Sequence, residues 1–134
     1  MKVLVTGSNG LLGQKITDLV LSKYSDIHLV ATARGENRHA VKNGYDYKEM
    51  DISNLNSLQT VLESEKPDVV IHTAAMTQVD DCEFQKEECV SLNITAVENI
   101  AKLSSILNFR LIHLSTDFIF DGTKKMYKED EQPN

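Results

Sequence analysis

The sequence lacks any long apolar run and any excess of basic residues. No run approaches the roughly 20 apolar residues of a membrane-spanning helix, and Met1 leads into a short apolar stretch without the pattern of a secretion signal. Lysine and arginine number 14 against 20 aspartates and glutamates, so the formal charge is −6. Phosphate backbones and anionic lipids repel such a chain. We therefore expect a cytoplasmic protein, with neither nucleic acid nor a membrane as a partner.

Cysteine is also scarce. Cys82 and Cys89 are the two cysteines of the chain, and they lie seven positions apart in a stretch with helical spacing. A continuous helix separates such residues by roughly 10 Å between Cα atoms, which is too far for a disulfide. The sequence thus predicts reduced, partly buried thiols.

Internal repeats, linkers and low-complexity segments are missing too, and 134 residues suffice for one domain but not for two. Apolar runs alternate with amphipathic stretches in units of about thirty residues, which predicts parallel strands with right-handed crossovers. The expected fold is α/β: a three-layered, Rossmann-type, doubly wound parallel sheet of order 3-2-1-4-5 that stops after its fifth strand. Strands are expected at residues 2–5, 27–33, 45–50, 69–72 and 109–114, helices at 11–24, 55–64 and 85–107, and loops at 35–44, 73–84 and 118–134.

A glycine-rich turn follows the first strand. Gly7, Gly10 and Gly13 are spaced for a sharp turn, for close approach of backbone amides to a pyrophosphate, and for tight packing of the next helix. The strand before the turn and the helix after it are the context in which this motif binds a dinucleotide. The alternative is a glycine turn without a ligand. The expected cofactor-binding residues of the turn are Gly7, Ser8, Asn9, Gly10, Leu11, Leu12 and Gly13.

No acidic residue ends the second strand. In NAD-binding folds a carboxylate at that point, about twenty residues after the glycine turn, bonds the adenine ribose 2′-hydroxyl. Here the strand ends in Arg34, with Arg38 nearby. Because a guanidinium suits bidentate contact with a 2′-phosphate, we expect NADP(H) in preference to NAD(H). The alternative is that Arg34 is a solvated charge at the strand end.

Further motifs follow the later strands. They are Asp51-Ile52, residues 72–75 (HTAA), Asn93 and residues 115–117 (STD). Together with the glycine turn they resemble the extended short-chain dehydrogenase/reductases over the whole length of the chain. Residues 79–83 and 114–122 are similar to dTDP-4-dehydrorhamnose reductases in particular. The resemblance implies NADP-dependent reduction of a nucleotide-linked 4-keto-6-deoxy sugar.

The resemblance also implies cofactor contacts at single residues. Asp51 would bind the adenine amino group and Ile52 would pack beside the ring, unless Asp51 only caps the next helix together with Ser53. The segment after the fourth strand would border the ribose and nicotinamide, because small side chains allow close approach. Its expected cofactor residues are Thr73, Ala74 and Ala75.

Two residues match catalytic positions of the family. Thr116 matches the hydroxyl residue that polarises the substrate carbonyl, and Asn93 matches the helix asparagine that supports an active-site water and lysine. The alternatives are a strand end for Thr116 and a solvated helix residue for Asn93. For His72 and His113, a place in the core is at least as well supported as a catalytic role.

The family's proton donor, a tyrosine four residues before a lysine, is absent. The four tyrosines are followed at the fourth place by His28, Glu49, Asp51 and Glu131. In the family this motif comes a few residues after a stretch like 129–134. We therefore expect residues 1–134 to be the cofactor-binding part of a longer reductase, inactive by itself.

Two other functions stay open. One is a non-catalytic NADP-binding subunit that resembles the regulatory subunit of methionine adenosyltransferase. The other is an NAD-dependent sugar-nucleotide epimerase or dehydratase, which the missing acidic residue disfavours. The helix at residues 85–107 could pair with its copy in a homodimer, although its apolar face is also the face that covers the sheet.

Overall fold

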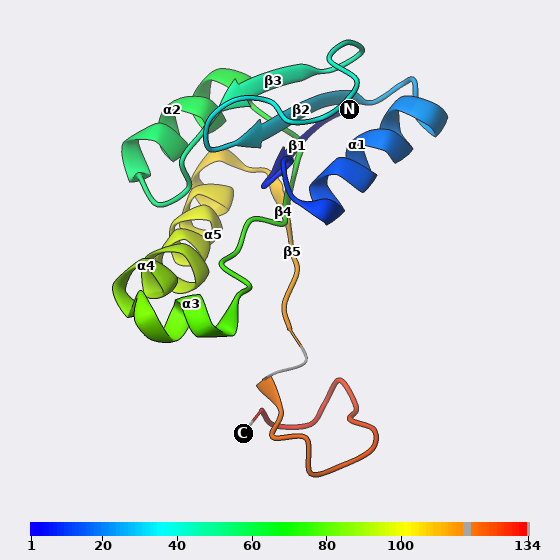
Figure 1. The fold of residues 1–134 in the computed structure, drawn as a ribbon. Helices are drawn as coiled ribbons and strands as arrows, with labels where there is room; N and C mark the ends of the chain where they lie inside the picture. Colours follow the sequence, from blue (N-terminus) through cyan, green and yellow to red (C-terminus); the bar gives the residue numbers. More distant parts are fainter. Residues whose placement is uncertain (117–118, 134) are drawn as a thin grey trace.

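Five parallel strands form a single sheet in the order β3-β2-β1-β4-β5 (Figure 1). The structure is a computed structural model that describes residues 1–116 and 119–133; Asp117, Phe118 and Asn134 of the motifs above lie outside the described residues. The predicted order and the parallel pairing are confirmed. The strands are β1 (Lys2–Thr6), β2 (His28–Ala33), β3 (Asp46–Glu49), β4 (Val69–His72) and β5 (Arg110–His113).

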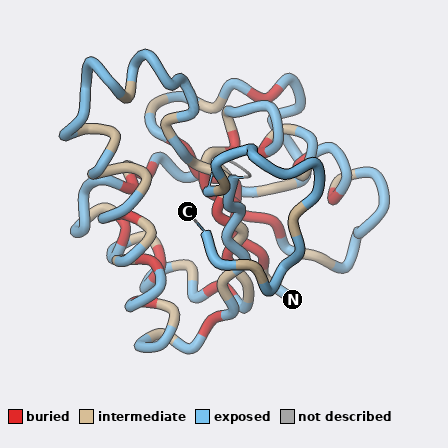
Figure 2. The backbone as a smooth tube through the Cα atoms, turned by 90° about the horizontal axis from the view of Figure 1, so that it is seen from below, coloured by how far each residue is buried: buried red, intermediate tan, exposed pale blue. Residues whose placement is uncertain are grey.

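Helices cover the sheet on both sides, as Figure 1 shows. One side carries α1 (Leu11–Lys23), and the other carries α2 (Leu55–Glu65) and α5 (Ala96–Leu107). Figure 2 shows buried residues along the strands and the helices, whereas the segment after β5 is exposed over most of its length. Within the described ranges, no helix is long and apolar enough to cross a membrane.

The sheet has a separate apolar core on each face because alternate side chains of a strand point to opposite sides. Leu4 of β1 packs in the same core as Leu58 of α2 and Ile100 of α5. Its neighbours Val3 and Val5 join the core under α1. These cores fix the carboxyl ends of the strands, and the segments that follow the strands, in one rigid frame.

The α1 side of the sheet is less completely covered than the sequence indicates. Val69 and Ile71 of β4 are only half-buried, and Ile112 of the edge strand β5 is 46% exposed. The expected burial of β4 on both faces is therefore only partly present, because α1 packs on β1 and β2. His113 is exposed, so its expected place in the core was wrong.

The predicted helix at residues 85–107 is present but interrupted by a π-helical turn. It comprises α4 (Lys86–Val90), the π turn η1 (Ser91–Thr95) and α5. A further short helix, α3 (Val79–Phe84), occupies part of the segment predicted as a loop.

The two cysteines form a disulfide, so the prediction of separate reduced thiols was wrong. That prediction assumed one continuous helix through both residues. Instead, Gln85 leaves the helical conformation, with φ −121° and ψ 55°, and the chain turns between α3 and α4. The turn brings the Cα atoms of Cys82 and Cys89 to 5.1 Å, within the range that a disulfide requires.

Candidate functional site

A cleft of about 230 Å³ lies at the carboxyl ends of the strands, where the strand order reverses between β1 and β4. This is where ligands of open α/β sheets bind. Eight residues predicted from four separate stretches of sequence line it: Gly7, Gly10, Arg34, Asp51, Ile52, Thr73, Ala74 and Ala75. The structure therefore brings most of the predicted cofactor residues together.

The glycine turn is closely packed at two of its three glycines. Gly7 has a φ of +69°, and a Cβ there would lie 2.7 Å from Cα of Ala74. A Cβ on Gly13 would lie 2.5 Å from the carbonyl oxygen of Gly7. Gly10 directly precedes α1 and is less closely packed, because a Cβ there would lie 3.3 Å from the Gly7 carbonyl oxygen; like Gly7, it lines the cleft. The free amides at the start of α1, which attract anions, thus begin at the cleft.

The other predicted residues of the turn are not among the described residues that line the cleft. Ser8 is buried, while Leu11 and Leu12 are exposed. Asn9 connects the turn to the segment after β2: its Nδ2 donates to the carbonyl of Glu36 at 2.9 Å, and its Oδ1 accepts from the amide of Arg38 at 2.8 Å. Asn9 therefore positions the segment that carries both arginines.

Arg34 lies at the rim of the cleft, directly after β2. Its side chain is 66% exposed, and its Nη1 lies 3.5 Å from Oε1 of Glu88 on α4. From the β3 side, the Tyr47 hydroxyl donates to the carbonyls of Gly35 at 2.5 Å and Ala33 at 3.3 Å. Burial raises the pKa of Tyr47, so the phenol stays protonated and remains a donor. The Tyr47 hydrogen bonds thus fix the backbone on both sides of Arg34, while the Arg34 guanidinium stays exposed to solvent.

Asp51 presents a carboxylate to the cleft. Its Oδ1 accepts from the Ser53 hydroxyl at 2.7 Å and from the Ser53 amide at 2.9 Å. The hydroxyl hydrogen bond, with smaller contributions from the amide and Arg34, lowers the pKa of Asp51 against the opposing effect of burial. Asn54 caps α2 by accepting from the amide of Ser57 at 3.1 Å. The alternative interpretation of Asp51 as a helix cap was therefore wrong.

The segment after β4 is held on the end of β1 by Thr6. The Thr73 hydroxyl donates to the Thr6 carbonyl at 2.7 Å, and the Ala74 amide donates to the Thr6 hydroxyl at 3.4 Å. That hydroxyl also lies 2.7 Å from Nδ1 of His72. Burial, together with the nearby ring of His113, lowers the pKa of His72 to about 4. His72 is thus a neutral core residue below the cleft.

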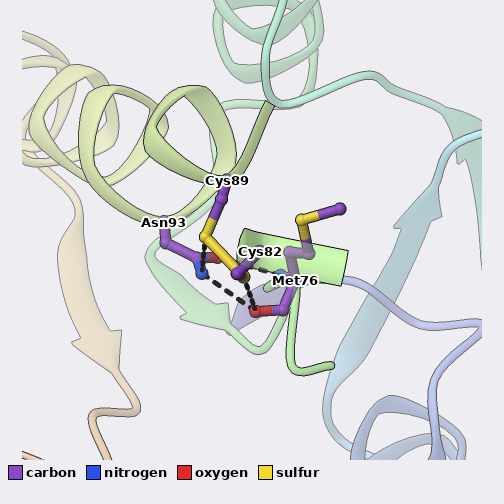
Figure 3. Close-up of a disulfide and its surroundings, with 4 residues drawn as sticks. All are labelled: Met76, Cys82, Cys89 and Asn93. Carbon is purple, nitrogen blue, oxygen red and sulfur yellow. Dashed lines mark hydrogen bonds between the residues drawn. A yellow bond between two sulfur atoms is a disulfide. The ribbon is translucent and has the colours of Figure 1, made fainter. Parts of the chain in front are cut away.

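The two predicted catalytic residues do not line the cleft. Asn93 lies in η1, where its Oδ1 accepts from the Met76 amide and its Nδ2 donates to the Met76 carbonyl, both at 2.9 Å (Figure 3). It is therefore not a solvated helix residue; it holds the segment after β4. Thr116 is exposed, three residues past the end of β5.

Sequence reasoning missed three residues of the cleft. Ala33 and Met50 directly precede the predicted residues Arg34 and Asp51. Their positions at or just after a strand end could have identified them from the sequence. Leu92 lies in η1. No residue type in residues 91–95 marks a π turn, and its contribution to the cleft could not be predicted.

Comparison with known proteins places the chain in a family. Residues 1–134 match the family described as RmlD substrate binding domain. The dTDP-4-dehydrorhamnose reductase of Aggregatibacter actinomycetemcomitans is 31% identical over 133 residues, which cover 97% of this chain and 40% of that protein. Methionine adenosyltransferase 2 subunit beta of Xenopus tropicalis is 30% identical over 138 residues, covering 99% of this chain and 37% of that protein.

A solved structure agrees with these matches. The hypothetical dTDP-4-dehydrorhamnose reductase from Sulfolobus tokodaii superimposes with a TM-score of 0.84 at 31% identity, over 100% of this chain and 46% of that one. The chain thus spans less than half the length of each of these proteins. The Rossmann-like fold and the resemblance to dTDP-4-dehydrorhamnose reductases are confirmed, and the chain belongs to the RmlD substrate binding domain family.

Proposed function

We propose that residues 1–134 bind a nicotinamide dinucleotide, NADP(H) in preference to NAD(H), as the cofactor-binding part of a reductase of a nucleotide-linked 4-keto-6-deoxy sugar. One observation carries the proposal: a single cleft joins the start of α1, the Arg34 guanidinium and the Asp51 carboxylate. Relatives that include a dTDP-4-dehydrorhamnose reductase support the substrate class.

The residues of the cleft fit the chemical groups of such a cofactor. Gly10 leaves the first amides of α1 open to the pyrophosphate, and Arg34 offers a cation to a 2′-phosphate. The Asp51 carboxylate can accept from the adenine amino group, with the buried Ile52 beside the ring. Because the cleft is smaller than the roughly 300–1,000 Å³ usual for small-molecule sites, we propose that it holds only part of the cofactor, with the adenosine at Asp51 and Ile52.

The cofactor, when bound, supplies hydride to the sugar carbonyl. Ala75 and the backbone around it would border the nicotinamide side. Thr116 would orient and polarise the carbonyl by donating a hydrogen bond. Asn93 would act through the Met76 backbone. Since the sequence contains no tyrosine four residues before a lysine, we expect cofactor binding without turnover at an ordinary enzymatic rate.

Titration of the chain with NADPH and with NADH, followed by nicotinamide fluorescence, tests the proposal. We expect tighter binding of NADPH. A clear preference for NADH would contradict the role of Arg34, and binding of neither would contradict the proposed function. Rapid reduction of a dTDP-4-keto sugar by the chain would contradict the expected lack of turnover.

A second candidate function is that of a regulatory subunit. It is favoured by the similarity to methionine adenosyltransferase 2 beta subunits of amphibians and mammals. Their alignments cover 98–99% of the length of this chain. Addition of the chain to a methionine adenosyltransferase catalytic subunit tests it. A changed rate or affinity for methionine would support the regulatory function, and unchanged kinetics would contradict it.

Homodimer formation is also part of the proposal. Val90 of α4 and Ile94 of η1 lie one helical turn apart and are 49% and 53% exposed, whereas Ile100 on α5 is buried against the sheet. An apolar helix surface is therefore available to a second copy. Sedimentation velocity measures the oligomeric state directly, and a monomer at high concentration would contradict this part of the proposal.

A further inference from the structure

The disulfide joins two short helices beside the cleft (Figure 3). Cys82 belongs to α3 and Cys89 to α4, and both residues are half-buried, outside the apolar cores of the sheet. The six residues of α3, all within the described part of the chain, include no buried residue, and the helix has no side-chain cap. So short a helix is marginal without tertiary support. The covalent bond to α4 is therefore a main constraint on the position of α3.

Both sulfur atoms also contact the groups that hold Met76. The Sγ of Cys89 lies 3.4 Å from Nδ2 of Asn93, and the Sγ of Cys82 lies 3.7 Å from the Met76 carbonyl oxygen. Asn93 itself makes two hydrogen bonds of 2.9 Å to the same Met76 backbone. Figure 3 shows the side chains of Cys82, Cys89 and Asn93 gathered beside the Met76 backbone.

Met76 is directly connected to the cleft. It follows Ala75, which lines the cleft, and Asn93 follows Leu92, which lines it from the helix side. The disulfide thus contacts Met76 in the segment after β4 and Asn93 in η1. Each of these two residues directly follows a residue that lines the cleft. A change in the position of α3 or α4 alters the support of both.

We propose that Cys82 and Cys89 are a thiol–disulfide modification site whose oxidation state sets the affinity of the cleft for its dinucleotide. The regulation rests on the proposed function. The partner is a dithiol reductant, or a low-molecular-weight disulfide in the opposite direction. A thiolate of the reductant attacks one sulfur to give a mixed disulfide, and its second thiol then displaces the protein. One S–S bond breaks and one forms, while two electrons and two protons pass to the cysteine pair.

Reduction frees α3 and removes the constraint that keeps Cys82 at the Met76 carbonyl. The segment after β4 then has fewer fixed contacts, and the cofactor must order it on binding. Ordering costs conformational entropy, so the reduced protein binds the dinucleotide more weakly.

The test compares the oxidised and reduced forms of the chain. After treatment with oxidised glutathione or with a phosphine reductant, alkylation and mass spectrometry report the state of the cysteines. Hydrogen exchange reports the Met76 amide, and fluorescence titration gives the NADPH dissociation constant. We expect faster Met76 exchange and roughly 3- to 10-fold weaker NADPH binding in the reduced form.

Cys82→Ser and Cys89→Ser should each resemble the reduced form under both treatments. In the Asn93→Ala variant the Met76 amide loses its acceptor, so it should exchange rapidly in both the oxidised and the reduced form. Failure of the disulfide to form, or identical Met76 exchange and NADPH affinity in the two states, would overturn the inference. If neither state binds a nicotinamide dinucleotide, the proposed function fails and the affinity effect with it, whereas Met76 exchange still decides whether the disulfide holds this segment.

Discussion

The guanidinium of Arg34 and the carboxylate of Glu88 form an ion pair at the rim of the cleft, with Nη1 and Oε1 3.5 Å apart. Leu92, one helical turn after Glu88, lines the cleft. The two charged side chains are 66% and 41% exposed, and exposed pairs of this kind contribute little to stability. Arg34 can therefore exchange Glu88 for a phosphate at small cost.

Arg34→Ala should weaken NADPH binding by about 10-fold or more, because a hydrogen bond to a charged group contributes about 1.5–3 kcal/mol. NADH lacks the 2′-phosphate, so its dissociation constant should change by less than about 2-fold. Fluorescence titration of both cofactors measures the difference. Arg110→Ala, at the start of β5, is the matched control and should leave both constants unchanged. Equal losses for both cofactors in Arg34→Ala would show that Arg34 does not contact the 2′-phosphate.

Glu88→Gln should have the opposite effect. The carboxylate competes for Arg34 and repels a bound 2′-phosphate, whereas the amide has nearly the same shape without the charge. NADPH affinity should rise by about 2- to 5-fold at low salt, with little change for NADH. Glu87→Gln, the exposed neighbour on α4, is the control for the loss of one negative charge. An unchanged ratio of the two affinities would separate Glu88 from the cofactor site.

Substitution of Gly10 and Gly13 by alanine should separate ligand binding from folding. Gly13→Ala places a methyl group against the Gly7 backbone and should lower the unfolding free energy by about 2–4 kcal/mol, the range of severe packing defects. Gly10→Ala has only a 3.3 Å contact, so it should cost less than about 1 kcal/mol. Its methyl group lies at the cleft, and dinucleotide binding should fall at least 10-fold. Urea unfolding and titration of both variants give the comparison; normal binding by Gly10→Ala would contradict the assignment of the pyrophosphate.

His72 should make the protein less stable in acid. The unfolded chain binds a proton at this residue with an ordinary pKa of 6.5, whereas the folded chain does so only near 4. Between these pH values the unfolded state holds more protons, so the unfolding free energy falls as the pH falls. The contribution is up to about 3 kcal/mol. Urea unfolding from pH 7 to pH 4 measures it.

His72→Gln should remove much of this fall, although the variant starts from a lower stability because Thr6 loses its partner. His28→Gln, which removes an exposed histidine of β2, should keep the fall. The same pH dependence in the wild type and in His72→Gln would show that another group causes it.

The sheet and most of the cleft could be predicted because they depend on regularities of residue type. Aliphatic runs such as residues 69–72 identify parallel strands, and the handedness of the crossovers then fixes their order. That order places the ends of the strands, and with them Gly10, Arg34, Asp51 and Ala74, at one edge. The sequence pattern was sufficient to predict the sheet and this edge because many residues together determine each strand.

The segment between β4 and β5 was less predictable because single residues decide its course. The turn at Gln85 separates α3 from α4, yet glutamine does not favour a helix break as glycine or proline does. The contact between Asn93 and Met76 depends on how the loop after β4 returns to the helix, which the spacing of apolar residues does not determine. For the same reason, the sequence pattern could not predict the disulfide or the position of Leu92 at the cleft.

The π turn also has a consequence for the phase of the helix. A five-residue π turn accommodates about one residue more than α-helical geometry, which rotates the following residues by about 100°. Leu92 and Asn93 can therefore face the cleft and Met76, while Ala96, Ile100 and Leu103 still face the sheet. Deletion of one residue within Ser91–Thr95 would force one of these two faces out of alignment, so the length of this segment is itself a structural determinant of the site.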